Sequence, residues 1–103
     1  MSRVNLTLIQ KDAMGSTLTS GSVNLKSYAF KAHRVLRRYG LDVTGIIIDS
    51  IHATDAELAK GFRINVKSIS PSLRQQLEKE LRPLGCHPFK VEKHMANVFD
   101  ISF

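Results

Sequence analysis

Residues 22–41 constrain the fold of this chain more than any other stretch, because an apolar stripe and a basic face alternate along them with helical spacing. Apolar residues that recur at steps of three and four lie on one side of a helix. Ser22 is a suitable N-cap, Gly40 suits a left-handed C-cap, and Leu41 can fold back onto the last turn. We therefore expect a helix over residues 22–41. Its buried stripe would comprise Leu25, Tyr28, Ala29, Ala32, Val35, Leu36 and Tyr39.

The opposite face of this predicted helix is strongly basic, and no acidic residue occurs between Asp12 and Asp42. Its cations are Lys26, Lys31, Arg34, Arg37 and Arg38. One interpretation is a solvated face whose last cations suit the negative end of the helix dipole. The other is a surface for a polyanion, either a nucleic-acid backbone or an acidic protein. The chain has 15 Lys and Arg against 9 Asp and Glu, a formal net charge of +6, which favours polyanionic partners.

Strand-like segments surround this helix and a second one. Alternating or β-branched apolar residues predict strands over 3–9, 42–51, 61–69, 87–93 and 97–103. Ser70 followed by Pro71 predicts the start of the second helix, and Pro83 and Gly85 predict its end. Its buried stripe would be Leu73, Leu77, Leu81 and Leu84. Thr54 and Glu57 have the spacing of a capping box, which predicts a single helical turn there.

The order β-α-β-β-α-β, followed by an extra C-terminal strand, predicts an α+β fold of the ferredoxin-like sandwich type. Two helices would cover one face of a four- to five-stranded sheet. The length of 103 residues predicts a single domain over 1–103. The last strand would present Phe99, Ile101 and Phe103 on one face. It could cap the sheet edge of its own subunit or pair across a two-fold axis, and because an uncovered apolar edge strand is a liability that dimerisation can remedy, a homodimer is expected.

The sequence KGFRINV, residues 60–66, resembles the start of the RNP1 motif of RNA-recognition domains, in which alternate aromatic side chains stack on bases. In this chain Phe62 and Ile64 should pack under the helices, because the reverse orientation would bury Arg63 and Lys67. The open sheet face would then lack an aromatic platform, so phosphate contact is the expected mode of binding. That face would show Arg3, Asn5, Thr7, Arg63, Asn65, Lys67, Lys90 and Glu92.

Asp12 and Gly15, after the first strand, are similar to an Asp and a Gly that ACT regulatory domains often carry at this point. In those domains the helix follows almost at once, whereas here about seven residues intervene. ACT domains bind amino acids and share the βαββαβ plan, so the resemblance implies a small-ligand sensor as an alternative. The glycines Gly15 and Gly21 enclose five residues and no Lys, which does not match a phosphate-binding P-loop.

No spacing along the chain matches a catalytic motif or a zinc site, since Cys86 and His87 are adjacent and His94 follows seven residues later. We therefore expect no enzyme activity, metal or cofactor. The single cysteine excludes an internal disulfide and fits a reducing compartment. The longest apolar run, 46–48, is too short for a membrane span, and residues 1–9 do not resemble a signal peptide. A cytoplasmic location is expected.

Together these features predict a small basic regulatory or accessory protein that binds DNA or RNA mainly through phosphates. The expected contacts are Lys26, Lys31, Arg34, Arg37 and Arg38, with Arg63 and Lys67 secondary. The alternative is an ACT-like sensor or a protein–protein adaptor that dimerises through its sheet. In that case the basic helix would dock onto an acidic partner.

Overall fold

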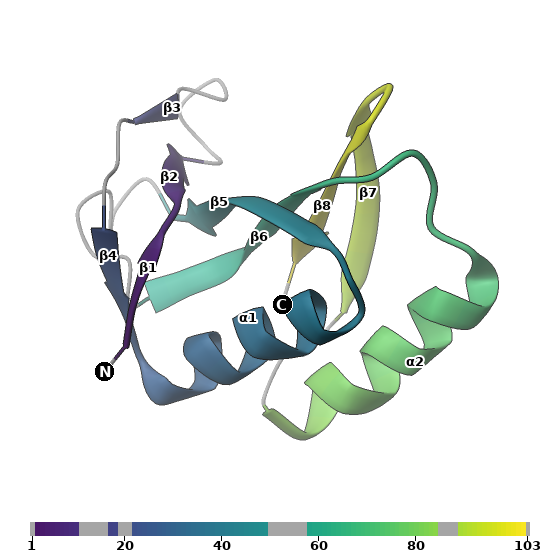
Figure 1. The fold of residues 1–103 in the computed structure, drawn as a ribbon, viewed down its shortest axis with the longest axis horizontal. Coiled ribbons are helices and arrows are strands. Elements are labelled where there is room, and N and C mark those ends of the chain that lie inside the picture. The colour runs from purple at the N-terminus through teal and green to yellow at the C-terminus, as the bar shows by residue number, and fades with distance from the viewer. Residues whose placement is uncertain (1, 11–16, 19–21, 50–57, 85–88, 103) are drawn as a thin grey trace.

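A computed structural model describes residues 2–10, 17–18, 22–49, 58–84 and 89–102. Within these residues the chain forms a six-stranded sheet, a separate two-stranded sheet and two α-helices (Figure 1). The elements are β1 Ser2–Asn5, β2 Thr7–Gln10, β3 Thr17–Leu18, β4 Ser22–Leu25, α1 Ser27–Arg38, β5 Asp42–Ile48, β6 Ala59–Asn65, α2 Pro71–Leu81, the 3-10 turn η3 Arg82–Leu84, β7 Lys90–Met95 and β8 Val98–Ser102.

The larger sheet has the strand order β3-β2-β5-β6-β8-β7, and only β2 and β5 are parallel. The expected α+β class is confirmed, but the ferredoxin-like strand order is not. That order splits the two strands of a β-α-β unit with another strand, whereas β2 and β5 are direct neighbours here. Gly45 allows this close pairing, because a Cβ atom there would lie 2.5 Å from Cδ1 of Ile9.

The predicted strand over residues 3–9 is two strands, which separate at the buried residue Leu6. β1 pairs antiparallel with β4 in the small sheet, whereas β2 enters the large one. The predicted helix start at Ser22 is therefore wrong. Residues 22–25 form β4, opposite β1, and Lys26 occupies the N-cap position of α1 without a side-chain cap. Leu25 reaches the core from a strand instead of a helix.

Local signals at the end of α1 and at the start of α2 are confirmed. Gly40 has φ +77°, and its N–H donates to the carbonyl of Arg37 over 2.9 Å. The N–H of Leu41 donates to the carbonyl of Leu36 over 3.2 Å, which completes a Schellman cap. At the start of α2 the hydroxyl of Ser70 accepts from the N–H of Leu73 over 3.1 Å.

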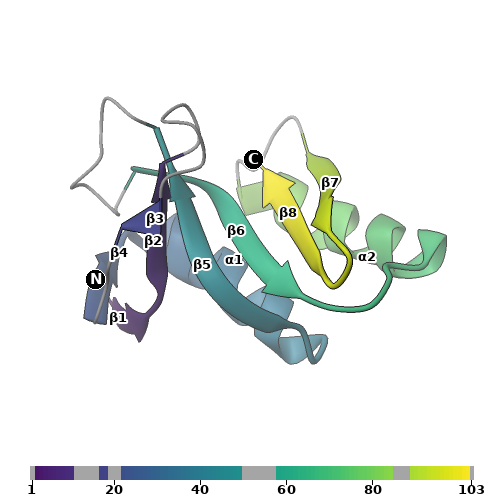
Figure 2. The ribbon, with the colours of Figure 1, turned by 90° about the horizontal axis from the view of Figure 1, so that it is seen from above.

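Both helices cover the same face of the large sheet, as Figures 1 and 2 show from two directions. The core lies between these layers, and Phe62 and Ile64 of β6 are fully buried in it, as their alternation with Arg63 predicted. Other fully buried members are Leu25, Leu36, Ile46, Ile48, Leu77, Leu81 and Ile101. Neither α1 nor α2, the two α-helices of the described residues, has the length and apolar content to cross a lipid bilayer.

The C-terminal strand β8 lies inside the sheet, between β6 and β7, and pairs with both. Of the two alternatives for this strand, the structure shows pairing within its own sheet, and the position of β8 gives no reason for dimerisation. The outer strand on this side is β7, in which residues 92–94 are charged or polar and exposed. The predicted turn at Thr54 and Glu57 and the residues Gly85 and Phe103 fall outside the described residues.

Candidate nucleic-acid interface

The outward side of α1 carries the cations that the sequence assigned to it. Lys31, Arg34, Arg37 and Arg38 are exposed along the helix, and Lys26 is exposed at its N-cap. We call these five residues the basic face. The opposite side of α1 contributes Ala29, Ala32, Val35 and Leu36 to the core. Packing against the sheet thus fixes the rotation of α1 and turns the basic face outward.

Most of this charge has no acidic partner in the part of the chain that the structure describes. Among the described residues, Arg38 is the only member of the basic face with an ion pair, which it forms with Glu80 of α2. The Arg38 side chain is 64% exposed, so this pair contributes little to stability. The same carboxylate accepts a hydrogen bond from the hydroxyl of Tyr39. That bond, with burial and the negative charge of Glu80, raises the pKa of Tyr39.

Two hollows flank the basic face. The first has a volume of about 540 Å³ and is lined by Phe30, His33, Arg34, Arg37 and Arg38. The second has a volume of about 340 Å³ and is lined by Lys31, Arg34, Val35, Arg38, Glu80 and Leu84. Because Arg34 and Arg38 line both hollows, the two form one basic surface with two depressions.

Aromatic rings form part of the first hollow. The rings of Phe30 and His33 are nearly parallel, with an interplanar angle of 18° and centroids 6.4 Å apart. The guanidinium carbon of Arg34 lies 5.9 Å from the Phe30 centroid, within the range of a cation–π contact. His33 also packs against Phe62 of the core, with centroids 5.8 Å apart. Burial, followed by the charge of Arg37, lowers the pKa of His33, which favours its neutral form.

Arg63 does not join the basic face. It lies on the sheet face opposite the helices, because its neighbours Phe62 and Ile64 pack inward. Its Nε donates to Oδ1 of Asp100 over 2.7 Å and its Nη2 to Oδ2 over 3.0 Å. The side chains of Arg63 and Asp100 are only 15% and 3% exposed, so this guanidinium is committed to a buried carboxylate.

The predicted open sheet face is divided in the structure. Arg3 and Asn5 belong to β1 in the small sheet, and Lys67, although exposed, lies beyond the end of β6. Lys90 and Glu92 of β7 are exposed and lie 3.7 Å apart. Among the sequence-predicted site residues, the structure therefore brings together only the five cations of α1.

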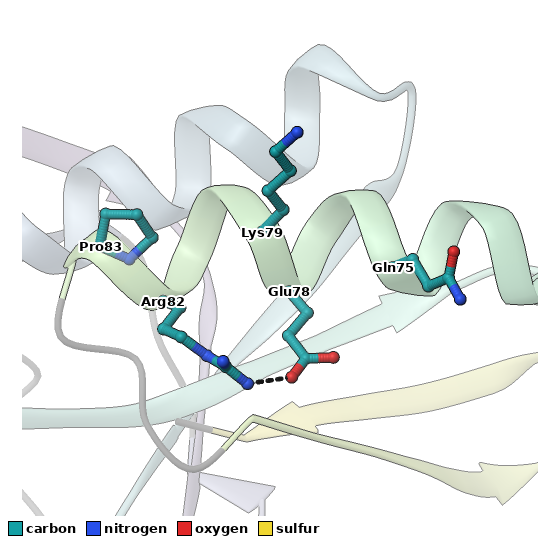
Figure 3. Close-up of a pocket in the computed structure, with 5 residues that line it drawn as sticks. All are labelled: Gln75, Glu78, Lys79, Arg82 and Pro83. Atoms are coloured by element: carbon teal, nitrogen blue, oxygen red, sulfur yellow. Dashed lines mark hydrogen bonds and ion pairs between the residues drawn. The ribbon is translucent and has the colours of Figure 1, made fainter.

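A further hollow lies along α2, with a volume of about 410 Å³ (Figure 3). It is lined by Gln75, Glu78, Lys79, Arg82 and Pro83. Glu78 and Arg82 form an ion pair one helical turn apart, and Figure 3 shows Lys79 directed away from them. Glu78 offsets one of the two cations that line this hollow, which makes it a poorer anion site than the basic face.

Within the described part of the chain, no three His, Cys, Asp or Glu side chains gather in a way that could hold a metal ion. Cys86 and His87 lie outside that part, as do Asp12 and Gly15, on which the ACT resemblance depends.

Reasoning from the sequence missed Phe30, because it belongs to neither the apolar stripe nor the cations. Its signal was nevertheless present, since a phenylalanine stands four residues before Arg34 and seven before Arg37. Such spacing places the three side chains on one helix surface.

Comparisons of the chain with models of protein families, with curated proteins and with solved structures find no match.

Proposed function

We propose that this protein binds nucleic acid without catalysing a reaction, and that the basic face of α1 makes the phosphate contacts. The observation that carries the proposal is the exposure of Lys26, Lys31, Arg34 and Arg37, none of which has an acidic partner among the described residues. Keeping several like charges side by side on one helix has an electrostatic cost. Binding of a polyanion would offset that cost.

The chemistry of the side chains fits phosphate oxygens. A guanidinium group presents a planar fork of donors that matches phosphate, and three of the five cations are arginines. Arg34 and Arg38 line both hollows, so one phosphate can be reached by more than one cation. Arg63 is removed from the proposed contacts because of its pair with Asp100.

The test is a titration of labelled DNA and RNA, single- and double-stranded, at several salt concentrations. Each phosphate contact contributes roughly 0.9 to the log–log salt slope for B-DNA and about 0.7 for single strands. The double variant Arg34→Ala/Arg37→Ala should therefore lower the slope by about 1.4 for a single strand. The affinity should fall along with it.

The matched control removes the same charge elsewhere. Lys90 and Lys93 are exposed on β7, at the far side of the sheet from β5, which α1 contacts. Lys90→Ala/Lys93→Ala should leave the slope close to that of the natural sequence. If both double variants lost affinity and salt slope equally, binding would depend only on the net charge of the protein and not on the basic face. Absence of binding at low salt would overturn the proposal, and an acidic protein would become the better candidate for a partner.

A further inference from the structure

The hollow beside Phe30 differs in kind from an ordinary phosphate site. Its walls combine the nearly parallel rings of Phe30 and His33 with three guanidinium groups, from Arg34, Arg37 and Arg38. Phosphate recognition alone needs no aromatic surface. Phe30 is partly buried and packs against the core. Because it also lines the hollow beside three guanidinium groups, it offers a flat apolar surface to a ligand bound there.

We propose that this hollow holds one base of a single-stranded nucleic acid, stacked on Phe30 and His33, while Arg34 and Arg37 bind the adjoining phosphates. This inference rests on the proposed function and deepens it, because it assigns the strand type and a mode of contact beyond charge. It also assigns the aromatic stacking surface to α1 and not to the sheet.

The dimensions and the chemistry of the hollow agree with such a ligand. Its volume of about 540 Å³ lies within the usual range for small-molecule sites, about 300–1,000 Å³. Single strands are bound by aromatic side chains that stack on bases and by basic grooves that follow the backbone. The guanidinium of Arg34 already lies over the Phe30 ring, and a planar guanidinium can stack on a base in the same manner.

Base pairing explains the preference for a single strand. In a duplex the bases are stacked on one another, and a flat protein pocket reaches them only after unpairing. An unpaired base can enter the hollow without that cost. The lowered pKa of His33 keeps its imidazole neutral near neutral pH, so the ring supplies a flat surface without adding charge.

The experiment compares two labelled strands of equal length and charge, one an oligothymidylate and the other an abasic deoxyribose–phosphate chain. The protein with its natural sequence should bind the thymidylate strand roughly 5- to 150-fold more tightly, the range measured for loss of one stacking contact. This comparison requires no variant, so it does not depend on whether a mutant folds.

Phe30→Leu then tests the residue itself. It keeps an apolar side chain on the helix but removes the ring, so the preference for thymidylate should disappear while the salt slope stays unchanged. Phe99→Leu is the matched control, because Phe99 is also partly buried and lies on β8, away from both hollows. Thermal unfolding of each variant verifies that it is folded.

The outcomes separate the two proposals. Equal affinity for the thymidylate and abasic strands would overturn base stacking and leave phosphate binding intact. Tighter binding of a duplex than of a single strand of equal length would overturn the assigned strand type. If thymidine monophosphate bound as tightly as the thymidylate strand, the assignment of a nucleic-acid strand as the ligand would be overturned. Failure to bind either strand at low salt would overturn the proposed function itself.

Discussion

Replacing Asp100 by Asn should destabilise the protein strongly, because Arg63 would lose its charged partner on a largely buried surface. Removing one member of a buried ion pair typically costs about 3–5 kcal/mol. The Arg63 side chain is still 15% exposed and an Asn can still accept a hydrogen bond, so we expect a cost somewhat below that range, about 2–3 kcal/mol. For a domain of this size each kcal/mol corresponds to about 4–8 °C in Tm, so Tm should fall by about 10–20 °C.

The assay is urea unfolding followed by circular dichroism, with Glu78→Gln as the control. Glu78 lies on α2, its side chain is 39% exposed and it pairs with Arg82 one helical turn away, so its replacement should cost only about 0–1 kcal/mol. A double-mutant cycle with Arg63→Met isolates the term between Arg63 and Asp100 from any other contact of the carboxylate, and its coupling energy should be about 1–3 kcal/mol. The reasoning would be refuted if Asp100→Asn destabilised the protein no more than Glu78→Gln does, or if the coupling energy were near zero.

Two further predictions concern Gly61 and His33. Gly61→Ala should lower the free energy of unfolding by about 2–3 kcal/mol. The added Cβ would stand 2.1 Å from the carbonyl oxygen of Ile101, so β6 would have to move away from β8. An unchanged midpoint of urea unfolding would contradict this prediction. The pKa of His33 is lowered from 6.5 in the folded protein by burial and by Arg37, so the unfolded chain binds more protons in mild acid and stability should fall as pH decreases from about 7.5 to about 5. His33→Gln should make the free energy of unfolding less dependent on pH over this range. The prediction would be contradicted if the free energies of unfolding of the variant and the natural sequence differed by the same amount at every pH.

Signals that act over one helical turn were readable from the sequence. Ser70 before Pro71 started α2, and Gly40 ended α1, because both caps depend on a few adjacent residues. The burial of Phe62 and Ile64 followed from the penalty for burying Arg63. The basic face was predicted correctly as a set of exposed residues because helical periodicity alone groups them. Its binding role stays a prediction.

Features that depend on distant residues were not readable. Ser22–Leu25 forms a strand because β1 pairs with it, and nothing within residues 22–25 reveals that partner. The strand order likewise depends on which strand lies beside β2, a choice that short-range alternation does not encode. Arg63 meets Asp100 only through the register of β6 against β8, across 37 positions of the chain. The hollow at Phe30 required the rotation of α1 and the position of Arg38 to be known.

The interior position of β8 bears on how the chain reaches this fold during synthesis. β6 leaves the ribosome well before residues 98–102 and must wait for them with one edge unpaired. An apolar strand with a free edge can pair with another chain, so the interval before β8 emerges is the time of greatest risk of aggregation. Slow translation between α2 and β8 would lengthen that interval, whereas a chaperone that covers β6 would make it harmless. Because β7 pairs with β8 and not with β6, the sheet is completed when the β7–β8 hairpin docks onto the free edge of β6.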